Sequence, residues 1–232
     1  MSQLESRVNA LIGDGWRLKR AGETDAALKA YDDALDALSG STDPVVPSLA
    51  VQVMLNRGVL LKSVGEDDGA SSMYVDLINI YGQAPPSGSE ARVAKAMLGL
   101  VDIVFDSGQH GVALQMYDAA LKFCTDHATD QTLLVRVDLL ISKAASLCEL
   151  GQEEQALALC RQAASELPSG LESIDELRCA ARTRRSQAAM EQAAGHASRA
   201  REIYEAVVVD FCGHTDPLVA SEVRSAEKAL RG

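Results

Sequence analysis

One arrangement of residues recurs five times along the 232-residue chain. Each copy begins with a glycine and has an alanine five positions later. The glycines stand 43 residues apart, and 44 apart in the last pair, at Gly22, Gly65, Gly108, Gly151 and Gly195. The alanines are Ala27, Ala70, Ala113, Ala156 and Ala200. Self-similarity at a fixed period indicates an array of repeated structural units.

Each unit is predicted to be a pair of helices joined by the glycine turn. Apolar residues before and after each glycine recur at three- and four-residue steps, the period of one helical face. Because the turn is so short, the two helices must be antiparallel. All six prolines lie between these hairpins or in the first turn after a break, where proline is tolerated. We therefore expect an all-α fold without strands. Its five repeats span about 2–40, 44–82, 89–126, 131–168 and 173–213, and a capping helix spans 216–231.

Small residues are expected where the two helices of a hairpin cross. Seven residues before the turn glycine stands a small or modest residue, such as Gly15 or Gly58. We expect it to lie opposite the repeated alanine, so that the helix axes can approach closely. The bulky residue nine positions after the glycine, such as Tyr31 or Tyr74, is expected to fill the gap to the next repeat.

This pattern resembles the tetratricopeptide repeat, in which glycine and alanine precede and follow the turn at these places. The segments 55–65 and 211–218 resemble the long bacterial variant, with a period of 43 residues here against about 34 in the usual repeat. Four positions depart from the pattern. Cys160 replaces an aromatic residue, Leu77 and Val207 replace alanine, and Arg184 stands where the family usually has a large apolar residue. The resemblance implies a right-handed superhelical solenoid of antiparallel helix hairpins, forming a single array over residues 1–232.

Charge and composition exclude several classes of partner. The formal net charge is −11, which argues against binding nucleic acid or an anionic membrane, because both need a basic surface. The polar N-terminus lacks the apolar run of a signal peptide, and no stretch is long and apolar enough to span a membrane. The five cysteines form no C-x-x-C pair and are expected to be reduced. We expect a cytoplasmic protein.

No motif for catalysis or cofactor binding is present. The sequence contains no phosphate-binding glycine loop, no dinucleotide fingerprint and no H-E-x-x-H. The nearest approach to a metal cluster is Cys212, His214 and Asp216, but a structural zinc site usually has four ligands in a recognisable spacing. We therefore expect no metal, no cofactor and no enzymatic activity.

The resemblance implies a binding groove on the concave side of the array. In that family the groove is lined by the first helix of each hairpin and binds a peptide or protein segment. The positions that match carry these residues: Asn9, Trp16, Asn56, Lys62, Lys95, Asp102, Asp138, Ser142, Arg182 and Arg185. An asparagine at the place of Asn56 often holds the backbone of a bound peptide in this family, whereas a solvated surface residue is the alternative.

Three arginines form a basic stripe in the fifth repeat. Arg178, Arg182 and Arg185 lie four and seven residues apart and so share one helical face. The stripe could hold a carboxylate-rich peptide, because arginine pairs with carboxylates through two hydrogen bonds. Alternatively it is a solvated face whose arginines pair within the helix, for instance with Asp175.

The sequence thus predicts a protein-interaction scaffold whose partner is an unidentified peptide or protein segment. Two other functions remain open at this point. One is a regulatory module that senses a peptide or ligand, and the other is a structural module that self-assembles into a homo-oligomer.

Overall fold

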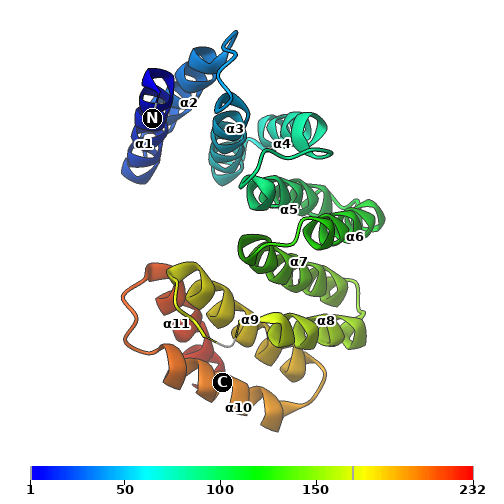
Figure 1. The fold of residues 1–232 in the computed structure, drawn as a ribbon. Coiled ribbons are helices and arrows are strands. Elements are labelled where there is room, and N and C mark those ends of the chain that lie inside the picture. Colours follow the sequence, from blue (N-terminus) through cyan, green and yellow to red (C-terminus); the bar gives the residue numbers. More distant parts are fainter. Residues whose placement is uncertain (1, 169, 232) are drawn as a thin grey trace. The chain divides into compact units, whose positions relative to one another are not determined.

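The computed structural model describes residues 2–168 and 170–231, and in this part of the chain every regular element is an α-helix (Figure 1). The helices are α1 (Gln3–Ala21), α2 (Thr24–Leu38), α3 (Val46–Ser63), α4 (Asp67–Tyr81), α5 (Glu90–Asp106), α6 (His110–Asp126), α7 (Asp130–Glu149), α8 (Glu153–Glu166), α9 (Ile174–Ala193), α10 (Ala197–Phe211) and α11 (Pro217–Arg231). The predicted all-α fold and its helix order are confirmed.

The repeated glycines terminate the first helix of each pair. All five have positive φ, between 73° and 83°, a region that residues with a side chain rarely adopt. At the first turn, Gly22 N–H donates to the carbonyl of Lys19 and Glu23 N–H donates to that of Leu18. The same two hydrogen bonds recur at the other four glycines, so each turn is a Schellman motif. The recurrence of the glycine along the chain therefore follows from backbone geometry.

The described residues form two compact units, one that ends at Gln109 and one that begins at His110. The first contains α1–α5 and the second α6–α11, so the two helices of the third repeat fall in different units. In the first unit α1 packs on α2 and α3 on α4, and in the second α7 packs on α8 and α9 on α10, as the hairpin prediction requires. The single array over 1–232 stays a prediction.

Tyrosine rings lie against the small residues on the first helices of the first two hairpins. A Cβ atom at Gly15 would lie 2.6 Å from Cε1 of Tyr31, and one at Gly58 would lie 2.5 Å from Cε1 of Tyr74. The Tyr74 ring also lies against Gly99 of α5, where a Cβ would be 2.8 Å from Cε2. The expected position of the alanine opposite this glycine stays a prediction, whereas the nearest neighbour of the glycine is the tyrosine ring. The tyrosine does fill the gap to the next repeat, as predicted.

The last helix, α11, covers the end of the second unit. It packs on α9 and α10 and buries Val219, Val223 and Ala226, while its exposed residues include Arg224, Lys228 and Arg231. One apolar and one charged face are what a capping helix needs, because it must cover a core on one side and face water on the other.

Candidate functional site

In each unit the odd-numbered helices form a layer of their own. In the first unit α1 contacts α3 and α3 contacts α5, and in the second α7 contacts α9 and α9 contacts α11. Among the described residues no such contact joins α2 to α4, α6 to α8 or α8 to α10. Each unit is therefore narrower on its odd-helix side. We call the surface that the odd-numbered helices form in each unit its inner face; the predicted groove residues belong to these helices.

In the first unit an ion pair joins two of the predicted groove residues. Lys62 Nζ on α3 lies 3.0 Å from the Asp102 carboxylate on α5. Both side chains are about one-third exposed, so the pair lies at the rim of the packed interface. Because the two residues belong to successive odd-numbered helices, this contact places both on the inner face.

In the second unit the structure brings three predicted residues together. Arg182 on α9 donates to Asp138 on α7 at 3.0 Å and to the Ser142 hydroxyl at 3.3 Å. Arg185, one turn further along α9, donates to Glu222 of α11 at 2.7 Å. Each arginine therefore already has a carboxylate partner on a neighbouring helix of the same layer.

The third arginine of the stripe is engaged in the same way. Arg178 donates to both oxygens of Asp216, at 3.0 and 2.6 Å, and to Asp175 within its own helix at 3.2 Å. The hydrogen bond from Arg178 holds the pKa of the Asp216 carboxyl at about 2, well below its usual range. Asp216 also accepts from the backbone N–H of Leu218 and Val219, and so caps α11. The basic stripe thus connects α9 to α7 and to the start of α11.

Four predicted residues of the first unit have no such connection. Asn9 and Lys95 are exposed, Asn56 is partly buried, and the side chain of Trp16 is 53% exposed. Within the described part of the chain, none of the four side chains makes an ion pair or a hydrogen bond. The guanidinium carbon of Arg20 lies 4.8 Å from the centroid of the Trp16 ring, in a cation–π contact. These side chains are available to a ligand.

A buried carboxylate at the α9–α10 turn was not predicted. Glu191 is 1% exposed and accepts two hydrogen bonds from Arg161 of α8, both at 3.1 Å, and contacts His196 Nδ1 at 2.8 Å. Burial opposes ionisation, but the hydrogen bonds from His196 and Arg161 outweigh it and lower the pKa of Glu191. Glu191 joins α8, α9 and the turn, and a sequence search for charged pairs thirty residues apart could have found the contact with Arg161.

The residues considered for metal binding have other roles. Asp216 pairs with Arg178, and the rings of His214 and Phe211 lie 6.4 Å apart. Among residues 2–168 and 170–231, no group of three acidic, histidine or cysteine side chains is arranged to hold a metal ion. In the same residues, no helix combines the length and apolar character needed to cross a bilayer.

Comparison with known proteins identifies the fold. BtubC from P. vanneervenii superposes with a TM-score of 0.64 at 16% identity, over 94% of this chain and 96% of that one. A putative kinesin light chain of TPR-like repeats from Podosopora anserina gives 0.61 at 15%, over 100% of both chains. A Rap conjugation gene regulator of the plasmid pLS20, in complex with a peptide, gives 0.63 at 15%, over 95% of this chain. No protein-family model and no curated protein matches the sequence.

The chain therefore has an all-α helical-repeat solenoid fold of the tetratricopeptide type, as the sequence predicted. At these identities the likeness shows the fold alone. The chain spans 62% of the length of the Rap regulator, so that protein's activity does not transfer with the fold. The neighbours' descriptions name repeat proteins of the tetratricopeptide and Rap types.

Proposed function

We propose that the chain is a protein-interaction module that binds a peptide or protein segment on the inner face of its helices. The observation that carries this proposal is the group of unpaired groove residues in the first unit: Asn9, Trp16, Asn56 and Lys95. An amide can hydrogen-bond an extended peptide backbone, and an exposed aromatic ring can cover an apolar side chain. Repeat arrays commonly use this side of the fold for binding.

The experiment is a selection of binding peptides from a random displayed library, followed by hydrogen exchange of the complex. The selected peptide is expected to slow exchange in the odd-numbered helices and to leave α2 and α4 unchanged. Helical amides exchange slowly in any case, so the comparison between layers of the same unit is the internal control. A library that yields no binder, or protection confined to even-numbered helices, contradicts the proposal.

A second candidate is a regulatory module that senses a peptide. The fold shared with a Rap gene regulator in complex with a peptide favours it. In this role the peptide changes the affinity for a second protein, and the coupling is reciprocal. Proteins captured from host extract are therefore compared with and without the selected peptide. An unchanged set of captured proteins contradicts sensing and leaves simple binding.

We propose further that the protein works in a reducing compartment such as the cytoplasm. All five cysteines are free thiols. Burial raises the pKa of Cys124 to about 11 and that of Cys160 and Cys179 to about 12. Such thiols are protonated and poorly reactive, as expected for core residues. Recovery of these three cysteines as disulfides from freshly lysed host cells contradicts this assignment.

A further inference from the structure

The arginines of α9 differ from Arg20 and Lys95 of the first unit in how they are engaged. In the second unit Arg178, Arg182 and Arg185 all contact carboxylates of neighbouring helices. A ligand carboxylate would have to displace one of these partners before it could bind there. In the first unit, Arg20 and Lys95 make no ion pair within the described residues. An acidic ligand therefore meets less competition at Arg20 and Lys95 than at the arginines of α9, although Lys62 of the first unit also has a partner, Asp102.

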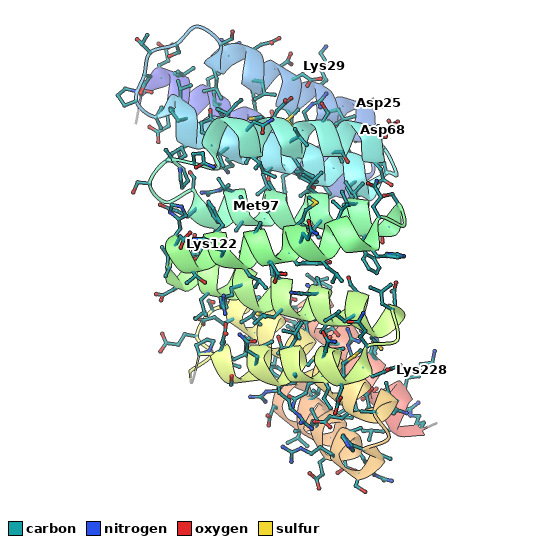
Figure 2. All side chains as sticks on the ribbon, turned by 90° about the vertical axis from the view of Figure 1, so that its right-hand side faces the viewer. Asp25, Lys29, Asp68, Met97, Lys122 and Lys228 are labelled. Carbon is teal, nitrogen blue, oxygen red and sulfur yellow. The ribbon has the colours of Figure 1, made fainter. Side chains whose placement is uncertain are left out.

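In the first unit, α1 and α3 differ in charge from α2 and α4. The sequences of α1 and α3 contain six cationic side chains against two acidic ones. Those of α2 and α4 contain one cationic side chain against seven acidic ones. Asp25 and Asp68 project from α2 and α4 into solvent (Figure 2). Three of these six cations already pair with carboxylates: Arg17 with Asp14, Arg57 with Asp32 and Lys62 with Asp102. The difference in net charge still disfavours a negatively charged segment on the outer helices and favours one on α1 and α3.

The same two inner helices also expose apolar side chains. Trp16 is 53% exposed and Val59 is 41% exposed. They stand 43 residues apart and so occupy the same place in successive repeats. Arg20 lies over the Trp16 ring, so a cation and an aromatic surface are presented together. A ligand that covers the ring with an apolar side chain can place a carboxylate beside this guanidinium.

We propose that the α1–α3 surface, defined by Trp16, Arg20 and Val59, binds a peptide segment in which an apolar residue is flanked by carboxylates. The apolar side chain covers Trp16 and Val59, and a carboxylate pairs with Arg20. This rests on the proposed function and specifies its ligand class and its location. The sequence favoured the arginines of α9 in the second unit as the site for an acidic segment. The proposed surface lies instead in the first unit.

The sole tryptophan of the chain lies on this surface and reports directly on its occupancy. The probe is a short labelled peptide in which leucine alternates with aspartate, and the control peptide has lysine in place of aspartate. The acidic peptide is expected to shift the emission of Trp16 to the blue as the ring leaves water. Added salt should weaken this binding, because the attraction is screened. The lysine peptide should give no shift.

Two variants on the same helix test the contact with Arg20. Arg20→Gln should weaken binding of the acidic peptide about two- to fivefold, the range for one exposed ion pair. Arg17→Gln removes the same charge from α1, but Arg17 already pairs with Asp14, so its effect should be smaller. Trp16→Ala, followed by anisotropy of the label, should weaken binding about tenfold or more, as expected for a central aromatic contact.

The outcomes separate this inference from the general function. Equal effects of Arg17→Gln and Arg20→Gln would show that only net charge matters and would overturn the assignment. Binding of the acidic peptide without a shift of Trp16 emission, or its loss in Arg182→Gln, would place the site elsewhere. If displayed-library peptides bind an inner face while the leucine–aspartate peptide does not, peptide binding stands and the acidic ligand class is wrong.

Discussion

The contact between Gly58 and Tyr74 gives the sharpest test of the packing. A Cβ atom at Gly58 would lie 2.5 Å from Cε1 of Tyr74, against an optimal carbon–carbon separation of about 3.5–4.0 Å. The ring cannot simply move away, because its other edge lies against Gly99 of the next repeat. We therefore expect Gly58→Ala to force α3, α4 and α5 apart.

The magnitude follows from two opposing contributions. Overpacking a filled core costs about 1–3 kcal/mol. Replacing glycine with alanine inside a helix contributes about 0.5–1 kcal/mol in the other direction. The net loss of unfolding free energy should be about 1–2 kcal/mol. The fifth repeat shows that a tyrosine can adapt, since Tyr204 accompanies Ala188 and is 6% exposed, against 1% for Tyr74.

The assay is urea unfolding followed by far-ultraviolet circular dichroism, with two matched variants. Gly13→Ala also lies in a helix, but a Cβ atom at Gly13 would have open space for 4 Å around it, so this change should stabilise by about 0.5–1 kcal/mol. The double variant Gly58→Ala with Tyr74→Cys copies the pair Ala144 and Cys160 of the fourth repeat. It should lose less stability than its two single changes added together. Equal stabilisation by both glycine changes would refute the packing argument.

Three further outcomes are expected. Gly151→Ala should lose about 1–2 kcal/mol of unfolding free energy, because φ is 73° at this position and a residue with a side chain is strained there, although the space around it is open. Unfolding midpoints in urea measure this loss. Glu191→Gln should lose about 1–3 kcal/mol near neutral pH. Folding lowers the pKa of Glu191, so its stabilising contribution is fully present at pH values above the pKa of the unfolded state. This contribution disappears as the pH falls through the pKa of the folded state. The unfolding free energies of the variant and the parent should therefore converge in acid. Ala156→Leu should lower the unfolding free energy by about 1–3 kcal/mol, because Ala156 is fully buried in α8 and the larger side chain overpacks the core. Thermal melts measure the loss, and full stability of the variant would show that the repeat register is wrong.

The fold was largely predictable because its signals are local and repeated. A glycine that must adopt positive φ leaves the same mark in every copy, and Gly22 and Gly195 differ by only 2° in φ. The alanine five residues later is buried each time, as Ala27 and Ala156 illustrate. Five copies average out the substitutions at single positions, so even Cys160 in place of tyrosine did not hide the register.

The contact between the small residue before the turn and the tyrosine was not predicted, for a specific reason. Periodicity identifies which face of a helix is buried, but it does not identify the side chain on the facing helix. Gly15 meets Tyr31, which stands sixteen residues later. The same spacing separates Gly58 from Tyr74. The sizes at these two positions give only a weak signal across the copies, because glycine precedes tyrosine in the first two, whereas Val101 precedes Tyr117 in the third.

The charged residues predicted for the groove belong to the odd-numbered helices, but their partners could not be read from neighbouring positions. Arg182 was weighed against Asp175 on its own helix, whereas the structure pairs it with Asp138, 44 residues earlier. An interaction between successive odd-numbered helices has a sequence separation near one full repeat. A search confined to three- and four-residue steps therefore misses it.

Repetition also helps to separate structural charges from binding residues. Asp32 of α2 pairs with Arg57 of α3 in the first unit. In the second, Asp118 of α6 pairs with Lys143 of α7, two periods later along the chain. A charge pair that recurs in register stabilises the stacking of one hairpin on the next. Trp16, by contrast, has no aromatic counterpart in the other repeats, and it is 53% exposed. Stacking does not explain such a residue, and this is why we assign it to ligand binding.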